Sequence, residues 1–480
     1  MAVKDLVLHP SKKRTVILIV LGILFVLFNT ILLVEEIYWF TLLPLAFMFG
    51  LLLLFYTEKA LFLTVFLVPL SINLGDLDFG LAISLPAEPL MMGLVLVILL
   101  CELYQPKINR QILKHPISIL IFAHLIWFLF TSITSEMPFV SLKAFMSQLW
   151  FIVPFYFFSA HVFLDLRKIH LFFWVSIVPL ALVILYSTYG LWNAGFDEEL
   201  SQSVMTPFYP NHTAYGAVIA LFLPFLFLNV FDKNKSNLVR GLACLLALVF
   251  CAGIILSYSR AVWASIPPAL AIALAIVFKI RFKTIMIGCL GVLGLVFVFH
   301  ENILMDLGKN KQDSSDKISE NIQSISNITT DDSNTERLNR WSSAISMFKE
   351  RPVFGWGPGT FQFQYAPFQK SKDLTLISTN AGSLGNAHSE YLGPLAERGF
   401  LGAGLFLSML IYSLFLSFRI YETSNNPLIK LAILSIIMGL ITYYIHGFLN
   451  NYLDIDKVAI PFWALIAMIT ALDIHCNKAT

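Results

Sequence analysis

Long apolar runs recur along almost the whole chain, and they constrain its fold more than any other feature. Most runs are about 17–22 residues long, which as α-helix is enough to cross the ~30 Å hydrocarbon layer of a membrane. A membrane β-barrel would instead show strands of ~10 residues with alternating polarity. Because helices satisfy their own backbone hydrogen bonds inside lipid, the runs predict an all-α integral membrane protein.

The composition supports this fold class. Hydrophobic residues make up 58% of the 480 residues and charged residues 13%, which leaves too little polar surface for a water-soluble globule. We therefore predict a polytopic bundle of about 12–14 transmembrane helices. The predicted crossings lie at residues 15–34, 37–56, 60–74, 87–104, 116–133, 144–163, 169–192, 213–231, 239–257, 262–278, 284–300, 400–420, 428–448 and 458–474.

The Lys and Arg residues predict the orientation of this bundle. Loops on the side of the N-terminus carry most of these cations, from Lys4 to Lys478, whereas the short loops on the other side hold Lys143, Arg260 and Lys457. Cytoplasmic loops are enriched in Lys and Arg, so both termini are expected in the cytoplasm. The long polar insert that precedes the last three crossings is then expected outside.

The chain is accordingly expected to have three regions. Residues 1–300 would form N-terminal transmembrane helices, residues 301–398 a large external loop, and residues 399–480 three C-terminal transmembrane helices. Within the loop, residues 308–335 are rich in Ser, Asn and Asp and poor in large apolar side chains. That composition predicts a mobile flap.

The second half of the external loop predicts an amphipathic helix at the membrane surface. Apolar residues recur at helical spacing until Pro352, and Arg337 and Arg340 lie off this stripe. The stripe consists of Leu338, Trp341, Ile345 and Phe348. The glycines and prolines of RPVFGWGPGTF (351–361) then predict an irregular, closely packed loop. Residues 337–398 hold seven cations and four acids, an excess that would attract an anion.

Two residues stand out from this background. Arg260, in SYSRAVW, lies in a short external loop, where it could hold an anionic ligand or snorkel towards a helix end. His388, in NAHSEYLGPLAERGFLG, could be a catalytic group or a structural histidine. The residues expected to share a helical face with it are Tyr391, Leu392 and Leu395.

The order of these motifs resembles the O-antigen ligase and polymerase family of bacterial polyisoprenyl-diphosphate glycan transferases. The resemblance extends from about Asn211 to the C-terminus. It is carried by SYSRAVW, RLNRWSSAISMFKERPVFGWGPGTF and NAHSEYLGPLAERGFLG. The first two or so predicted crossings have no counterpart among the family's helices.

The resemblance implies a GT-C-like membrane glycosyltransferase that uses an undecaprenyl-diphosphate-linked glycan as donor. His388 matches the family's histidine and would be the general base, a role that an ordinary imidazole pKa of ~6.5 suits. Arg260 and Arg340 match its two arginines and would bind the diphosphate, with Arg337 as a further ligand. The implied transfer to a hydroxyl acceptor inverts the anomeric carbon and needs neither metal nor cofactor.

The resemblance also implies the setting of the reaction. The acceptor would be lipid A-core or a growing polysaccharide, in the bacterial inner membrane with a periplasmic active site and no nucleic-acid partner. Possible glycan or lipid contacts are Asn211, His212, Tyr391, His446 and Asn450. Glu390, two residues after His388, is expected to point away from the imidazole rather than orient it.

Two other functions remain open on the sequence. A lipid-linked oligosaccharide flippase or transporter would also need many crossings, but it would not explain the long external insert. A peptidoglycan-type glycan polymerase would act on a similar lipid through an external acid, for which Asp454 and Asp456 are the candidates. Within the resembling family, no residue distinguishes a ligase from a polymerase or a protein glycosyltransferase.

Overall fold

A computed structural model describes residues 12–77, 83–298, 332–370, 374, 378 and 385–479. Most of the predicted mobile flap lies outside these residues, and at its end helix α18 (Asp332–Glu350) has already begun. The chain divides into two compact units, Met1–Ala60 and Leu61–Thr480, which we call the N-terminal unit and the main unit. The three-region organisation expected from the sequence stays a prediction.

Within the described residues, eleven helices are long and apolar enough to cross a membrane, which confirms the all-α polytopic fold. The N-terminal unit holds α2 (Lys12–Val34), the short 3-10 helix η1 (Trp39–Leu42), α3 (Leu43–Phe55) and the start of α4 (Thr57–Leu67). The main unit continues with η2 (Val68–Leu70), β1 (Ile72–Asn73), η3 (Leu74–Leu77), β2 (Ser84–Leu85), α5 (Ala87–Tyr104), α6 (Arg110–Leu113), α7 (Pro116–Ile133), α8 (Pro138–Ile152), the π-helix η4 (Val153–Phe158), α9 (Ser159–Val162), α10 (Leu166–Asn193), α11 (Glu198–Ser201), α12 (His212–Phe231), α13 (Asn237–Leu256), α14 (Arg260–Val277), α15 (Phe282–Val298), α18, α19 (Phe361–Gln364), η5 (Ala366–Phe368), α20 (Leu392–Thr423), α21 (Pro427–His446) and α22 (Asp456–Ala479).

One predicted crossing, 60–74, is wrong in its bounds. Helix α4 has 11 residues and therefore spans about 16 Å, half of what a crossing requires. After Leu67 the chain tightens into η2, where Pro69 has no N–H to donate to a continuing helix. It then enters β1, which pairs with β2 in an antiparallel two-stranded sheet. The predicted runs at 37–56 and 284–300 contain the shorter helices α3 and α15, with 13 and 17 residues.

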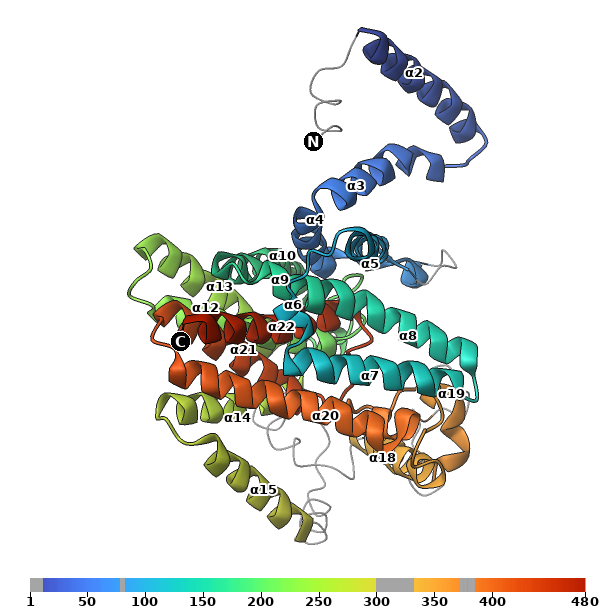
Figure 1. The fold of residues 1–480 in the computed structure, drawn as a ribbon. Helices are drawn as coiled ribbons and strands as arrows, with labels where there is room; N and C mark the ends of the chain where they lie inside the picture. Colours follow the sequence, from blue (N-terminus) through green and yellow to red (C-terminus); the bar gives the residue numbers. More distant parts are fainter. Residues whose placement is uncertain are drawn as a thin grey trace. The chain divides into compact units, whose positions relative to one another are not determined.

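Three helices form the centre of the main unit. The apolar windows of α12, α21 and α22 are 78%, 72% and 94% buried, and Figure 1 shows them surrounded by other helices of this unit. Helices α12 and α21 approach closely because Gly439 has no side chain, since a Cβ there would lie 2.4 Å from the backbone oxygen of Leu221. Small residues allow this kind of close packing between membrane helices.

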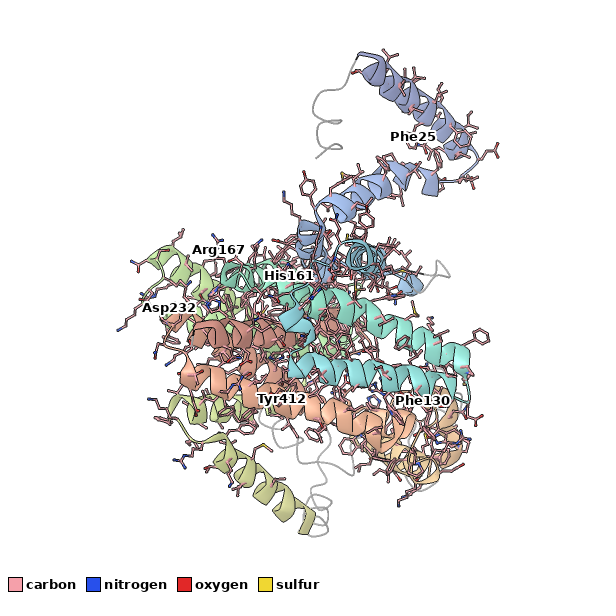
Figure 2. All side chains as sticks on the ribbon, viewed as in Figure 1. Phe25, Phe130, His161, Arg167, Asp232 and Tyr412 are labelled. Atoms are coloured by element: carbon pink, nitrogen blue, oxygen red, sulfur yellow. The ribbon has the colours of Figure 1, made fainter. Side chains whose placement is uncertain are left out.

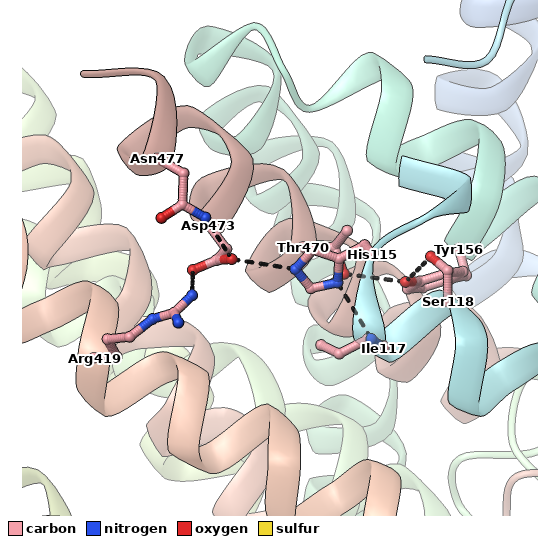
Figure 3. Close-up of polar contacts among 8 residues, drawn as sticks. All are labelled: His115, Ile117, Ser118, Tyr156, Arg419, Thr470, Asp473 and Asn477. Atoms are coloured by element: carbon pink, nitrogen blue, oxygen red, sulfur yellow. Dashed lines mark hydrogen bonds and ion pairs between the residues drawn. The ribbon is translucent and has the colours of Figure 1, made fainter. Parts of the chain in front are cut away.

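Buried polar side chains tie α22 to its neighbours, as Figure 3 shows. Asp473 accepts a hydrogen bond from Arg419 on α20, and it lies 3.2 Å from Nε2 of His115, the residue before α7. Its Oδ2 atom also accepts a hydrogen bond of 3.1 Å from Asn477. These contacts leave the buried carboxylate paired with cations and donors, which a charge at this depth requires.

The two ends of the main unit differ in the residues they carry. Figure 2 places Arg167 and Asp232 at one end of the bundle and Phe130 at the other. In Figure 1 the C-terminus lies at the first end, whereas α18 and α19 lie near Phe130's end. Arg167 and Asp232, in or next to loops predicted as cytoplasmic, therefore lie at the opposite end from Phe130, which is next to a loop predicted as external.

Helix α18 is a helix as predicted, and the face that it buries in the protein is not the apolar stripe. Ala344 and Met347 are buried, and so are the polar residues Glu336 and Arg340, whereas Ile345 of the apolar stripe is 40% exposed. The polar face can be buried because its groups find partners inside the protein. The apolar stripe is thus the more exposed face of α18.

The glycine-rich loop after α18 packs directly against the start of α20, as the sequence predicts. The backbone N–H of Trp356 donates to the Ala396 oxygen at 3.1 Å, and that of Gly357 donates to the Glu397 oxygen at 2.9 Å. Gly355 and Gly399 have φ angles of +68° and +66°, a region that disfavours residues with a Cβ. The two backbones touch because both glycines lack side chains.

Replacing Gly355 with alanine is expected to destabilise the protein by about 1–3 kcal/mol. Besides the unfavourable φ, a Cβ there would lie 2.3 Å from the carbonyl carbon of Glu397. Gly404→Ala in α20 is the matched control, since its Cβ would meet nothing within 4 Å. Thermal unfolding in detergent compares the two variants, and equal Tm values would contradict a required glycine at position 355.

Candidate active site

His388 lies on a bend in front of α20, and not on the helix as the sequence suggested. Its φ is +47°, a left-handed conformation that interrupts the chain before the helix begins at Leu392. Its N–H donates to Asn386 Oδ1 at 3.1 Å, and its carbonyl oxygen accepts from Trp341 Nε1 at 3.3 Å. Contacts to α18 and to a neighbouring amide therefore hold the backbone of this bend.

Arg340 holds the chain just before His388. Its Nε forms a buried ion pair of 2.6 Å with Glu336, and its Nη1 donates to the Asn386 oxygen at 3.2 Å. The guanidinium lies 5.0 Å from the centre of the Tyr365 ring and occupies the space beside Gly385, where a Cβ would come within 1.7 Å of Nη1. Arg340 is 3% exposed, so these contacts use much of its hydrogen-bonding capacity.

Arg337 is the cation whose charge reaches most of the predicted site. The pKa of His388 is lowered to about 3, mainly by burial and further by the charges of Arg337 and Arg340. Both burial and neighbouring positive charge oppose protonation of the imidazole. Arg337 also lies within electrostatic range of His212, His446 and Tyr452. It thus stands among three histidines that come from three separate parts of the chain.

Arg260 also lies near one of these histidines. It is the first residue of α14 and lies within electrostatic range of His212, the first residue of α12. The two helix starts are adjacent because Gly216 on α12 packs against Val262 on α14, with 2.9 Å between a Cβ at Gly216 and Val262 Cγ2. The fold therefore gathers Arg260 and Arg337 around the same histidine.

The predicted contact residues Asn211, His446 and Asn450 belong to one hydrogen-bond network. Asn211 Oδ1 caps α12 by accepting from the Ala214 N–H at 2.8 Å. The hydroxyl of Tyr452 lies 3.3 Å from Asn211 Oδ1 and 3.2 Å from Asn450 Oδ1. Asn450 Nδ2 lies 3.2 Å from His446 Nε2, and His446 Nδ1 has no hydrogen-bond partner among the described residues.

Glu390 is the residue that sequence reasoning undervalued. Its Oε1 accepts hydrogen bonds from the Tyr443 hydroxyl at 2.6 Å and from the N–H groups of Tyr452 and Leu453 at 2.7 and 2.9 Å. Its own N–H donates to the Gly447 oxygen at 2.8 Å. Glu390 thereby joins the His388 bend to the loop between α21 and α22, and burial raises its pKa to about 7.

Tyr391, predicted as a possible glycan or lipid contact, packs within the protein. Its hydroxyl donates to the Tyr444 oxygen at 2.7 Å, and its ring centre lies 4.4 Å from that of Phe448. The hydroxyl is therefore satisfied by α21. Its role as a glycan contact stays a prediction.

The two acids proposed for the peptidoglycan-type alternative lie in different surroundings. Asp456 accepts from the Ser71 hydroxyl at 3.3 Å and from the Lys457 N–H at 2.8 Å, so it holds the start of α22 in place. Asp454 lines a cavity beside the His388 bend, where burial raises its pKa to about 6. Of the two, Asp454 is the one that faces open space.

The region that holds this candidate site is similar to known proteins. A family model described as O-antigen ligase matches residues 242–407, a span that includes Arg260, Arg337, Arg340 and His388. An uncharacterized protein of Haemophilus influenzae (strain ATCC 51907 / DSM 11121 / KW20 / Rd) is 26% identical over 224 residues. That alignment covers 46% of this chain and 53% of the relative, so the chain spans about half of the relative's length. Residues 242–407 of this multi-pass membrane protein are therefore similar to the O-antigen ligase family.

Proposed function

We propose that this protein transfers a glycan from undecaprenyl diphosphate to a hydroxyl group of lipid A-core or of a growing polysaccharide. The observation that carries the proposal is that Arg337 lies within electrostatic range of His212, His388 and His446, and that Arg260 lies within range of His212. Two guanidinium groups beside an uncharged imidazole suit a reaction in which a diphosphate leaves and a hydroxyl loses its proton.

The diphosphate is held by Arg337 and Arg260. Planar guanidinium groups bind phosphate oxygens through paired hydrogen bonds, and they stabilise the charge that grows on the leaving oxygen. Arg340 acts differently, because its ion pair with Glu336 and its bond to Asn386 hold the His388 bend. The sequence ranked Arg340 above Arg337 for diphosphate binding, but the ion pair and hydrogen bond that engage Arg340 favour a positioning role for it.

The chemical step is an in-line displacement. The acceptor oxygen forms a bond to the anomeric carbon, the bond from that carbon to the diphosphate oxygen breaks, and the hydroxyl proton passes to the His388 imidazole. The anomeric carbon is inverted, and undecaprenyl diphosphate departs with the electron pair. No redox partner is consumed, and the arginines supply the positive charge that the leaving group needs.

Substrate binding adjusts the basicity of His388. In the ligand-free protein its pKa is about 3, so the imidazole is neutral at physiological pH but is a weak base. A bound diphosphate brings negative charge next to Arg337 and Arg340, which offsets their effect on the imidazole. The pKa of His388 therefore rises when the donor is bound, and the imidazole becomes a stronger base.

The protein works in the bacterial inner membrane with both termini in the cytoplasm and the site on the periplasmic face. The cation distribution along the sequence supports this orientation. The positions of Arg167 and Asp232 at the opposite end of the main unit from Phe130 in Figure 2 are consistent with it. In this orientation the donor's diphosphate is at the outer surface of the bilayer and its lipid chain remains in the membrane.

Replacing Arg337 with alanine is expected to lower kcat/KM for glycan transfer by about 10²–10³-fold, and lysine is expected to restore part of that loss. The assay uses the full chain in liposomes with a polyprenyl-diphosphate-linked glycan, and it measures both the glycosylated acceptor and the released polyprenyl diphosphate. Lys349→Ala is the control, an exposed cation on the same helix.

Two results would count against the proposal. If Arg337→Ala and Lys349→Ala have equal activities, Arg337 does not hold the diphosphate. If the wild-type protein moves the lipid-linked glycan across the bilayer without releasing polyprenyl diphosphate, the protein is a flippase.

A further inference from the structure

A cavity of about 500 Å³ lies beside the His388 bend, among residues of α7, α8, α20 and α22. Four residues of the bend line it, and His388 itself is not among the lining residues. These four are Asn386, Ala387, Ser389 and Glu390. The candidate arginines Arg260, Arg337 and Arg340 do not line it either, so the cavity is a separate space from the diphosphate site proposed above.

The wall of this cavity carries more acid than base. Asp454, Glu390 and Glu397 line it together with one arginine, Arg398. The Arg398 guanidinium contacts His124 Nε2 at 3.2 Å and lies 4.7 Å from the centre of the Phe128 ring. An acidic, partly buried wall repels phosphate and other anions. Among the described residues, no group of three or more His, Cys, Asp or Glu side chains could hold a metal ion.

Three polar groups on the lining residues have no hydrogen-bond partner among the described residues. They are the indole N–H of Trp463, the Nε of Arg398 and the Oδ1 of Asn451. Trp463 is 1% exposed and Arg398 is 9% exposed. Buried polar groups in folded proteins are nearly always paired, so these atoms call for a ligand that offers both acceptors and donors.

The apolar part of the lining narrows the choice of ligand. Phe361, Phe406 and Trp463 add aromatic surface to the acids and amides. A sugar ring matches this combination, because its hydroxyl groups both donate and accept while its C–H faces pack on aromatic rings. The cavity volume lies within the range of small-molecule sites.

We propose that this cavity binds an uncharged sugar unit of the glycan substrate, apart from the diphosphate. The inference rests on the proposed function, since it names a substrate part for the same reaction. The sugar unit can come from the donor glycan or from the acceptor glycan. Because the wall is acidic, the site selects uncharged sugars over uronic acids.

Filling the cavity tests the proposal directly. Ala144 on α8 lines it, so Ala144→Trp puts an indole into the space. Met146→Trp is the matched control, since Met146 lies on the same helix and is 44% exposed. The probes are methyl glycosides of glucose, galactose, mannose and N-acetylglucosamine, compared with methyl glucuronide and methyl galacturonide, by saturation-transfer NMR on the full chain in detergent.

At least one uncharged glycoside is expected to bind the wild-type protein and Met146→Trp, and to lose at least about tenfold in affinity in Ala144→Trp. The uronides are expected to bind at least about tenfold more weakly than the uncharged sugars at pH 7.5, and Asp454→Asn is expected to narrow that difference. Binding of no glycoside, equal binding of uronides, or unchanged binding in Ala144→Trp would overturn the assignment.

Transfer kinetics identify the source of the sugar. A rise in KM for the acceptor alone in Ala144→Trp assigns the cavity to the acceptor glycan, and a rise for the donor alone assigns it to the donor glycan. Unchanged KM values for both would overturn the assignment even in an active enzyme. If the wild-type protein transfers no glycan but the binding pattern holds, the proposed function fails and the sugar site stands.

Discussion

Replacing His388 with alanine is expected to reduce glycan transfer by about 10²–10⁴-fold, the usual contribution of a general base. The protein should remain folded, because the contacts that hold the bend are made by the backbone of His388 and by Arg340. Binding of sugar glycosides should also persist, since His388 does not line the cavity. His475→Ala, near the opposite end of α22, is the matched control.

The pH dependence of transfer tests the same residue more sharply. The pKa of His388 is lowered to about 3 in the free protein, so its neutral form persists as the pH falls through 6 and 5. The fall in kcat/KM at acid pH that results from protonation of His388 should therefore lie below pH 5. The corresponding fall in kcat should lie at higher pH, because the bound diphosphate raises the pKa of His388. Arg337→Ala should move the kcat/KM limb upward by removing one of the charges that lower it.

The His388 variant also separates the proposed function from its rivals. Full transfer by His388→Ala together with an inactive Asp454→Asn would favour the peptidoglycan-type mechanism. A low-activity His388→Ala beside an active Asp454→Asn would favour the histidine base. An acid limb that stays in place in Arg337→Ala would contradict the electrostatic link between Arg337 and His388.

Replacing Glu390 with alanine is expected to be the most destabilising single change at the site. It leaves the Tyr443 hydroxyl and the N–H groups of Tyr452 and Leu453 buried without their shared acceptor. At about 1–3 kcal/mol for each unpaired group, the loss should be about 3 kcal/mol or more. Glu390→Gln keeps an oxygen acceptor in the same place and should lose less.

Glu390 also makes stability depend on pH, with a definite sign. Burial raises its pKa from 4.5 to about 7, so the folded protein holds this proton more tightly than the unfolded chain. The stability it contributes is present at low pH and is lost as the pH rises through about 7. Asp454 acts in the same direction, but its pKa is raised only to about 6.

Thermal unfolding in detergent between pH 6 and 8 measures this effect. The Tm of the wild-type protein should fall across this range more than that of Glu390→Gln, which has no carboxyl proton to lose. Glu422→Gln is a suitable control, because it removes an exposed carboxylate at the far end of α20. A wild-type Tm that rises with pH, or equal slopes in the wild type and Glu390→Gln, would contradict the raised pKa of Glu390.

Much of the fold follows from local patterns. A run of about 20 apolar residues has few stable structures in lipid other than a helix, and the described helices occupy nearly all the predicted runs. The exception near residue 70 shows the limit of that rule. Hydrophobicity continued past Leu67, but Pro69 and the pairing of β1 with β2 ended the helix.

The buried face of α18 shows what periodicity leaves out. The sequence pattern finds the apolar stripe of an interfacial helix, but it does not say which of the other side chains are buried in the protein. Here Arg340 is buried because Glu336, one turn earlier, and the Asn386 carbonyl, far along the chain, are both in reach. A local pattern can show the pairing with Glu336 but not the hydrogen bond to the Asn386 carbonyl oxygen, which comes from a distant part of the chain.

The sequence points to the candidate site residues but not to the contacts that each of them makes. Arginine and histidine side chains are uncommon in an apolar chain, so the sequence alone draws attention to Arg260, Arg337, Arg340 and His388. The sequence predicts that Glu390 lies on one helix with His388 and points away from the imidazole, which gives Glu390 no role at the site. The acid is instead turned by the bend towards Tyr443 and Tyr452. Trp463 could not be found at all, since a tryptophan in a membrane helix is ordinary.

The sequence by itself determined that the chain is a multi-pass helical membrane protein, where the polar insert lies, and which motifs it shares with the O-antigen ligase family. These are properties of composition, spacing and order, which need no knowledge of distant contacts. Only the tertiary structure decided that Arg340 is bound to Glu336, that Arg337 stands among the histidines, and that an acidic cavity opens beside His388. Those facts depend on which segments the packing of α12, α14, α18, α20 and α21 brings together, and no local pattern encodes that packing.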